Sequence, residues 1–185
     1  MSNGVCYFFT FLIEAVILWQ YSSNLFTARR KPWIQFAMLF LFYVTMFAIS
    51  LLEHKWLNMT LYFILNFIFL FIQYDLKWYS ALFHSAVLAA IMGMCELTIY
   101  SIMERFSPHF LAESGPFQNM IIFIIFSKMI FFTIVYILIH VLKGQQTQNR
   151  QHDKSVLILI FIPVTSVFIM LTLVSISDSF LLSPL

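Results

Sequence analysis

The stretch KWYSALFHSAVLAAIMGMCEL, residues 77–97, decides the fold class of this chain. Most of its side chains are apolar, and a helix of about 20 such residues crosses the hydrocarbon core of a bilayer, about 30 Å thick. The stretch also carries His84, Cys95 and Glu96, residue types that perform chemistry in many proteins. It therefore predicts a transmembrane helix, and it raises the question of whether these three residues form an active site, a sensing element or structural contacts.

The rest of the chain has the same apolar character. Of the 185 residues, 62% are hydrophobic and 10% are charged, whereas a soluble domain has about 45–50% and about 25%. Lipid offers no water to backbone groups, so helices are the default, and the apolar runs lack the period-two alternation of a membrane β-barrel. We therefore predict an all-α fold, a polytopic transmembrane helical bundle that forms a single domain over residues 1–185. Its six helices are expected at about 5–25, 33–52, 56–73, 78–103, 118–142 and 155–176.

Basic residues in the connections predict the orientation, because cytoplasmic loops carry an excess of Lys and Arg. The first, third and fifth connections hold seven of them: Arg29, Arg30, Lys31, Lys77, Lys143, Arg150 and Lys154. The second and fourth connections hold Lys55 and Arg105, while Lys128 lies inside a helix. We therefore expect a multi-pass protein of the plasma membrane with its N-terminus outside.

Three ionisable residues lie inside predicted helices, where a charge is costly and usually faces a partner or a cavity. At about 1.5 Å of rise per residue, Glu14 lies about 14 Å below the outer end of its helix, Glu96 about 11 Å and Lys128 about 15 Å. Similar depths on three helices predict a charge cluster in the outer half of the membrane. The cluster is either a structural ion pair or the polar floor of an outward-facing ligand cavity.

His84 and Cys95 share a helical stripe, because eleven steps of about 100° nearly complete three turns. They are nevertheless about 16 Å apart along the axis, and a catalytic pair needs hydrogen-bond reach, about 3 Å. Cys95 is therefore expected to be a packing residue. His84 is expected either to hydrogen-bond to a neighbouring helix or to respond to pH or a ligand.

Motifs of catalysis and cofactor binding are missing from the sequence. It contains no metal-ligand spacing, glycine-rich phosphate loop or nucleophile elbow. We expect no catalytic residue, no metal and no cofactor in this chain. The net charge of +2 comes from the connections, so we expect the lipid bilayer as a partner and no nucleic acid.

Two further features concern recognition and motion. The connection of residues 105–119 is expected to face outward and to help to gate a ligand site. Its candidate ligand-facing residues, together with His84, are Phe106, His109, Phe110 and Phe117. Pro163 removes a backbone hydrogen bond in the sixth predicted helix and should kink it, either as a packing feature or as a hinge.

Two stretches carry a family resemblance, FFTFLIEAVILWQYSSNLF (residues 8–26) and YFILNFIFLFIQYDLKWYSALFHSAVLAAIMGMCELTIY (residues 62–100). They resemble the membrane region of sensor histidine kinases of Gram-positive bacteria, relatives of the accessory-gene-regulator quorum-sensing receptors. In that family a multi-helix sensor precedes a kinase core with a GHKL-type ATPase domain. The resemblance implies the sensor domain of a two-component signal-transduction system, an extracellular peptide as ligand, and a homodimer at full length.

The chain departs from that family after its membrane region. It stops at SISDSFLLSPL, residues 175–185, without a phosphoacceptor helix or an ATPase domain. The charge pattern puts this end outside, whereas a seventh helix would bring the chain back to the cytoplasm. We therefore expect the sensor part of a longer protein or a truncated gene product, with no enzymatic activity of its own.

Two other functions stay open as alternatives. A small membrane transporter, or its substrate-binding subunit, would have a similar size, but such proteins tend to have Gly-rich broken helices and internal repeats, and this chain has 4 Gly. A membrane peptidase would need a histidine from another helix beside Cys95.

Overall fold

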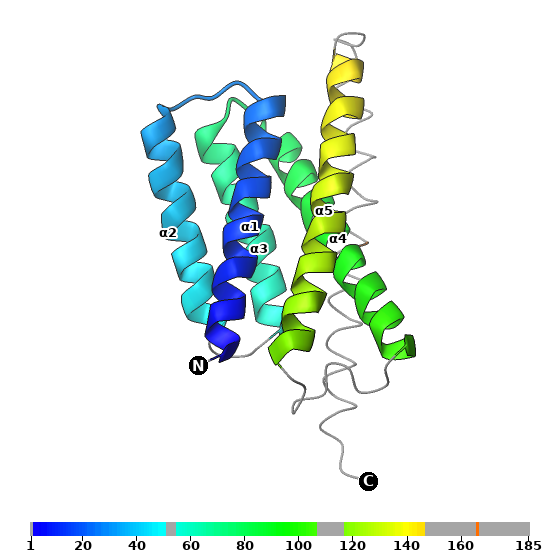
Figure 1. Ribbon diagram of the computed structural model, residues 1–185. Helices are drawn as coiled ribbons and strands as arrows, with labels where there is room; N and C mark the ends of the chain where they lie inside the picture. Colours follow the sequence, from blue (N-terminus) through cyan, green and yellow to red (C-terminus); the bar gives the residue numbers. More distant parts are fainter. Residues whose placement is uncertain (1, 51–54, 107–116, 147–165, 167–185) are drawn as a thin grey trace.

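The computed structural model describes residues 2–50, 55–106 and 117–146, together with Ser166. This part of the chain forms five helices, α1 (Ser2–Leu25), α2 (Pro32–Ser50), α3 (Lys55–Gln73), α4 (Trp78–Phe106) and α5 (Phe117–Gln146) (Figure 1). The described residues contain no named β-strand, so the predicted all-helical bundle is confirmed. The structure describes five helices and not six, because the predicted helix over 155–176 lies outside the described residues except for Ser166.

The helices pack as a closed ring. Each helix contacts the next along the chain, and α5 returns to contact α1. The bundle interior is made of large, fully buried side chains such as Tyr21, Phe69, Leu88 and Phe131. This order places α1, α4 and α5 side by side, although they are far apart in the sequence (Figure 1).

Length and surface chemistry fit a bilayer. Three segments are long and apolar enough to cross a membrane, Pro32–Ser50, Trp78–Met103 and Asn119–Lys143, and the apolar segment Leu57–Gln73 is shorter. Large apolar side chains cover the outside of the bundle, among them Phe40, 73% exposed, and Met129, 64% exposed. Such side chains suit contact with lipid tails, and we conclude that this is a membrane protein.

Small polar side chains within the helices are satisfied locally. Thr45 donates to the carbonyl of Leu41 at 2.9 Å, and Thr98 donates to that of Met94 at 2.7 Å. A hydroxyl that bonds one turn back on its own helix is tolerated in lipid without a partner helix. These residues therefore do not disturb the apolar character of the bundle.

The α1–α2 and α3–α4 connections pair with each other at one end of the bundle. The Arg29 amide donates to the Gln73 carbonyl at 2.8 Å, the Asp75 amide donates to the Thr27 carbonyl at 3.1 Å, and Ala28 forms an antiparallel bridge with Tyr74. The Arg29 guanidinium also contacts the Asp75 carboxylate at 3.1 Å. We call residues 27–29 and 73–75 the loop clamp; it fixes this end of the bundle.

Candidate functional site: a polar core inside the bundle

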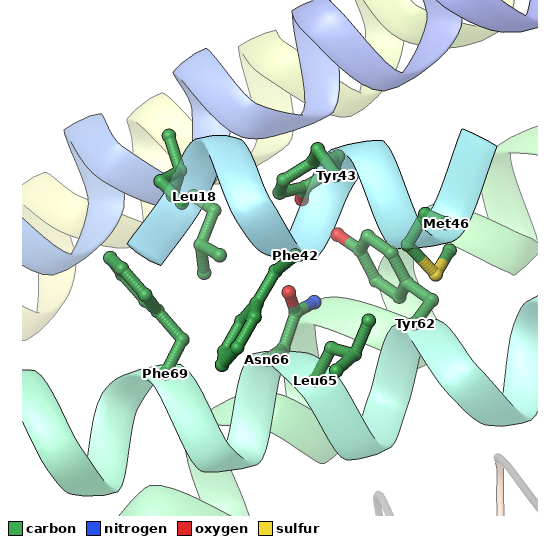
Figure 2. A pocket seen from close by; sticks show the side chains of 9 residues that line it. Leu18, Phe42, Tyr43, Met46, Tyr62, Leu65, Asn66 and Phe69 are labelled. Atoms are coloured by element: carbon green, nitrogen blue, oxygen red, sulfur yellow. The ribbon is translucent and has the colours of Figure 1, made fainter. Parts of the chain in front are cut away.

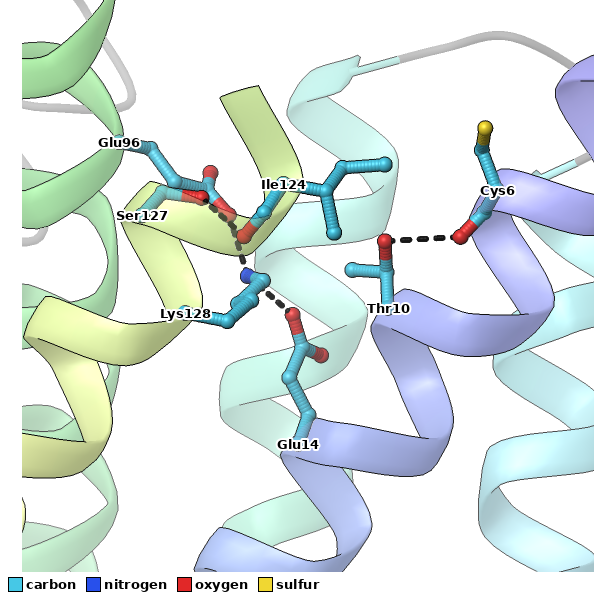
Figure 3. A network of polar contacts seen from close by, with 7 residues as sticks. All are labelled: Cys6, Thr10, Glu14, Glu96, Ile124, Ser127 and Lys128. Carbon is cyan, nitrogen blue, oxygen red and sulfur yellow. Dashed lines mark hydrogen bonds and ion pairs between the residues drawn. The ribbon is translucent and has the colours of Figure 1, made fainter. Parts of the chain in front are cut away.

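Lys128 lies at the centre of a charged triad inside the bundle (Figure 3). Its amino group donates to Glu14 Oε1 at 2.6 Å and to Glu96 Oε1 at 2.5 Å. The three residues come from α5, α1 and α4, the helices that the closed ring brings side by side. The three charges assigned to one depth by counting residues are therefore in direct contact.

The triad is buried on one side and open on the other. Glu14 and Lys128 each have 3% of the side chain exposed, whereas Glu96 has 38%. Two carboxylates face one ammonium, so the triad carries one excess negative charge when both are ionised. An unpaired charge at the centre of a membrane helix costs about 2.5–3.5 kcal/mol, which explains why Lys128 and its partners lie together. The excess charge is nearest to the surface at Glu96.

A second polar group adjoins the triad, between α1, α2 and α3. It consists of Tyr43 on α2 with Tyr62 and Asn66 on α3, which line a narrow space among apolar side chains (Figure 2). Tyr62 and Asn66 lie one turn apart on α3, and the Glu14 carboxylate acts electrostatically on both phenols. All five described helices thus contribute at least one polar side chain to what we call the polar core: Glu14, Tyr43, Tyr62, Asn66, Glu96 and Lys128.

The polar core contains hydrogen-bonding atoms without partners. Glu14 Oε2, the Tyr43 hydroxyl and Asn66 Nδ2 are buried and make no hydrogen bond in the part of the chain that the structure describes. The space beside Tyr43 and Asn66 has no room for a water molecule. A buried polar atom without a partner costs about 1–3 kcal/mol, so these atoms are unsatisfied in the arrangement that the structure records.

His84 forms a hydrogen bond between helices. Its Nδ1 lies 2.6 Å from the hydroxyl of Tyr21 on α1, and its ring packs against Phe26 at a centroid distance of 4.8 Å. The structure thus shows the first of the two alternatives expected for His84, a hydrogen bond to a neighbouring helix. His84 lies on α4 near the loop clamp. It is twelve positions before Glu96, so the two residues are about 18 Å apart along the helix axis.

The two cysteines are buried and free. Cys95 has 4% of its surface exposed and packs in the main apolar cluster. Among the described histidines, His84 pairs with Tyr21, and His140, near the C-terminal end of α5, contacts the Tyr136 carbonyl at 3.0 Å. The described residues thus bring no histidine into contact with Cys95, and they contain no cluster of three metal-ligating side chains.

Several predicted recognition residues fall where the structure gives no side-chain description. His109, Phe110 and Pro163 lie outside the described residues. Phe106 ends α4 and Phe117 begins α5. The expected gate over residues 105–119 and the expected hinge therefore stay predictions.

Counting charges along the sequence did not find Tyr43, Tyr62 and Asn66. A signal for Asn66 existed, because an amide inside the apolar run FILNFIFLF usually bonds to another group within the membrane. The two tyrosines carried no such signal, since tyrosine is also common at membrane interfaces. No protein-family model matches this chain, and no curated protein or solved structure shows significant similarity to it.

Proposed function

We propose that this chain is the membrane sensor domain of a two-component sensor histidine kinase of the GHKL type. It is a multi-pass domain of the plasma membrane with its N-terminus outside. It detects an extracellular or membrane-borne signal, such as a peptide, and passes the event to a kinase core in the cytoplasm. The chain itself performs no chemistry.

The observation that carries the proposal is the polar core, above all the charged triad with its half-open carboxylate. Ionisable groups inside a membrane domain are expensive and mark functional sites by default. Glu96 presents a carboxylate at the bundle surface, and Tyr43, Asn66 and Glu14 hold unused hydrogen-bonding atoms beneath it. The recorded arrangement has no space for a ligand beside these buried atoms. A ligand with polar groups can therefore satisfy them only in a second arrangement in which the helices move apart, whereas apolar packing alone would not require such atoms.

The same contacts offer a route for the signal. A ligand shifts a conformational equilibrium only if it binds two arrangements with different affinity. A group that competes for Glu96 would change the contact with Lys128 and so the packing of α4 against α5. Lys128 is fifteen positions before Lys143, about 22 Å along α5. At that inner end Lys143 donates to Asn24 of α1 at 2.9 Å, so a shift of α5 there alters its contact with α1.

Two measurements test this function. The reading frame beyond codon 185 should encode a histidine kinase core; a different product or a stop codon would contradict the kinase assignment.

Spin labels at Ser23 and Val141, both exposed, should report the distance between the inner ends of α1 and α5. We expect Lys128→Met to shift that distance distribution relative to the native side chain, with Thr133→Val as the control. Identical distributions would contradict transmission through the triad.

A further inference from the structure

The loop clamp holds its connections in place relative to the helices. Beneath it, Ser22 of α1 donates to the hydroxyl of Tyr74 at 2.9 Å, and Tyr74 is fully buried. A phenol is neutral at physiological pH, and burial raises the pKa of the Tyr74 phenol further. Gln35 of α2 donates its side-chain amide to the Arg30 carbonyl at 3.0 Å, which fixes the chain just after the clamp. The backbone from which the basic side chains of this region project is therefore held in place.

The face around the clamp is strongly basic. Five exposed basic residues lie there, Arg29, Arg30, Lys31, Lys77 and Lys143. Among the described residues at this end of the bundle, the acidic residue is Asp75, and its carboxylate is already paired with Arg29. The face therefore has a surplus of positive charge. This charge comes from the α1–α2 connection, the α3–α4 connection and the end of α5, and not from one flexible tail.

Two tryptophans place this face at the surface of the membrane. Trp33 in the first turn of α2 is 85% exposed, and Trp78 at the start of α4 is 58% exposed. Indole rings at the ends of transmembrane helices lie at the level of the lipid headgroups. Lys31 and Lys77 precede these tryptophans by two residues and one residue, so their ammonium groups lie close to the lipid phosphates.

We propose that the clamp face binds anionic phospholipid headgroups, with Arg30, Lys31 and Lys77 as the phosphate-binding residues and Trp33 and Trp78 as the interfacial anchors. Juxtamembrane basic residues near an anionic surface contribute about five-fold in affinity each. The charge attracts the phosphate, while the indole rings keep the contact within the bilayer interface. This inference rests on the clamp and its charges and does not depend on the proposed sensor function.

Quenching of tryptophan by brominated lipids tests the proposal. The purified protein is reconstituted into vesicles of phosphatidylcholine with brominated phosphatidylglycerol, or with brominated phosphatidylcholine as the neutral reference. We expect phosphatidylglycerol to compete several-fold better for the annular positions of the native protein. The triple variant Arg30→Gln, Lys31→Gln, Lys77→Gln should lose most of this preference, and 0.5 M salt should reduce it because screening shortens the range of the charges.

Two controls separate the outcomes. Arg105→Gln changes an exposed basic residue at the other end of α4 and should leave the preference intact. Arg30→Lys keeps the positive charge and should also leave the preference for phosphatidylglycerol intact. Soluble glycerol phosphate at millimolar concentration should not displace the lipid, because it lacks the interfacial anchor. Equal quenching by the two brominated lipids in the native protein, or an unchanged preference in the triple variant, would overturn the proposal.

Discussion

Lys128 and Tyr21 show how single polar groups position whole helices in this bundle. Lys128 has two acidic partners on two helices, whereas Tyr21 makes one hydrogen bond, to His84, and is otherwise packed among aromatic rings. The two residues lie at different depths, so they connect α1 to its neighbours at two separate levels. Removing either group tests one level without disturbing the other.

Tyr21→Phe removes the hydroxyl that bonds His84 and leaves the ring in place. Hydrogen bonds between membrane helices contribute about 0.6 kcal/mol on average and up to about 1.7 kcal/mol. Because Tyr21 is fully buried, we expect a loss of about 1 kcal/mol in the free energy of unfolding in mixed micelles. Tyr100→Phe on the outside of α4 serves as the matched control and should change nothing measurable. Equal effects of the two substitutions would mean that the contact with His84 is not stabilising.

Helix α2 is the element with the narrowest contact with the rest of the bundle. It buries one stripe of side chains, Gln35, Leu39, Tyr43, Met46 and Ser50, and shows its other faces to the surroundings. The spacing of three and four residues is that of one helical face. Because the whole helix is apolar, this stripe was not evident from hydropathy. Hydropathy separates residues that face water from residues that do not, but it does not separate a face that contacts lipid from a face that contacts protein.

Substitutions on the two faces of α2 should differ strongly. Met46 is 2% exposed, and Met46→Ala leaves a cavity between α2 and α3, so we expect a loss of about 2 kcal/mol. Phe40 is 73% exposed, and Phe40→Ala should cost less than about 0.5 kcal/mol despite the larger truncation. Thermal unfolding in detergent measures both. A larger loss for Phe40→Ala would mean that α2 presents its other face to the bundle.

The elements themselves were largely predictable from the sequence, but their contacts were not. The predicted helix over 78–103 corresponds to α4 and extends to Phe106, and the helix over 118–142 corresponds to α5 and extends to Gln146. Length and hydropathy predict such segments because a helix must be long and apolar enough to cross the hydrocarbon core of the bilayer. The triad was foreseeable because depth follows from counting residues. The place of Tyr43 and the neighbours of Asn66 were not foreseeable, because they depend on how each helix is rotated about its axis.

At the scale of the whole molecule, the distribution of basic residues defines the orientation that we propose. The clamp face would lie in the cytoplasm and the far ends of α4 and α5 outside. The native cysteines are buried, so single cysteines can be introduced after they are replaced by alanine. Thr27→Cys, in the exposed part of the clamp, should resist an impermeant thiol reagent in intact cells and react after permeabilisation. Arg105→Cys should react in intact cells. The reverse pattern would contradict the orientation with the N-terminus outside.

We expect the triad to stabilise the packing of α1, α4 and α5, because it is a buried charged contact between all three helices. A set of neutralising variants tests this claim most directly. Glu14→Gln and Glu96→Gln alone each leave Lys128 one carboxylate partner. The double variant leaves a buried ammonium without an anion, which costs about 3–5 kcal/mol when a buried pair is broken.

The decisive measurement is the free energy of unfolding in mixed micelles for the native protein, both single variants, the double variant and the double variant with Lys128→Met added. Cys95→Ala serves as the control for a neutral change beside Glu96. We expect the double variant to lose about 1–3 kcal/mol more than the sum of the two single losses, and Lys128→Met to recover part of that loss. Additive losses within about 0.5 kcal/mol, with no recovery by Lys128→Met, would contradict the triad.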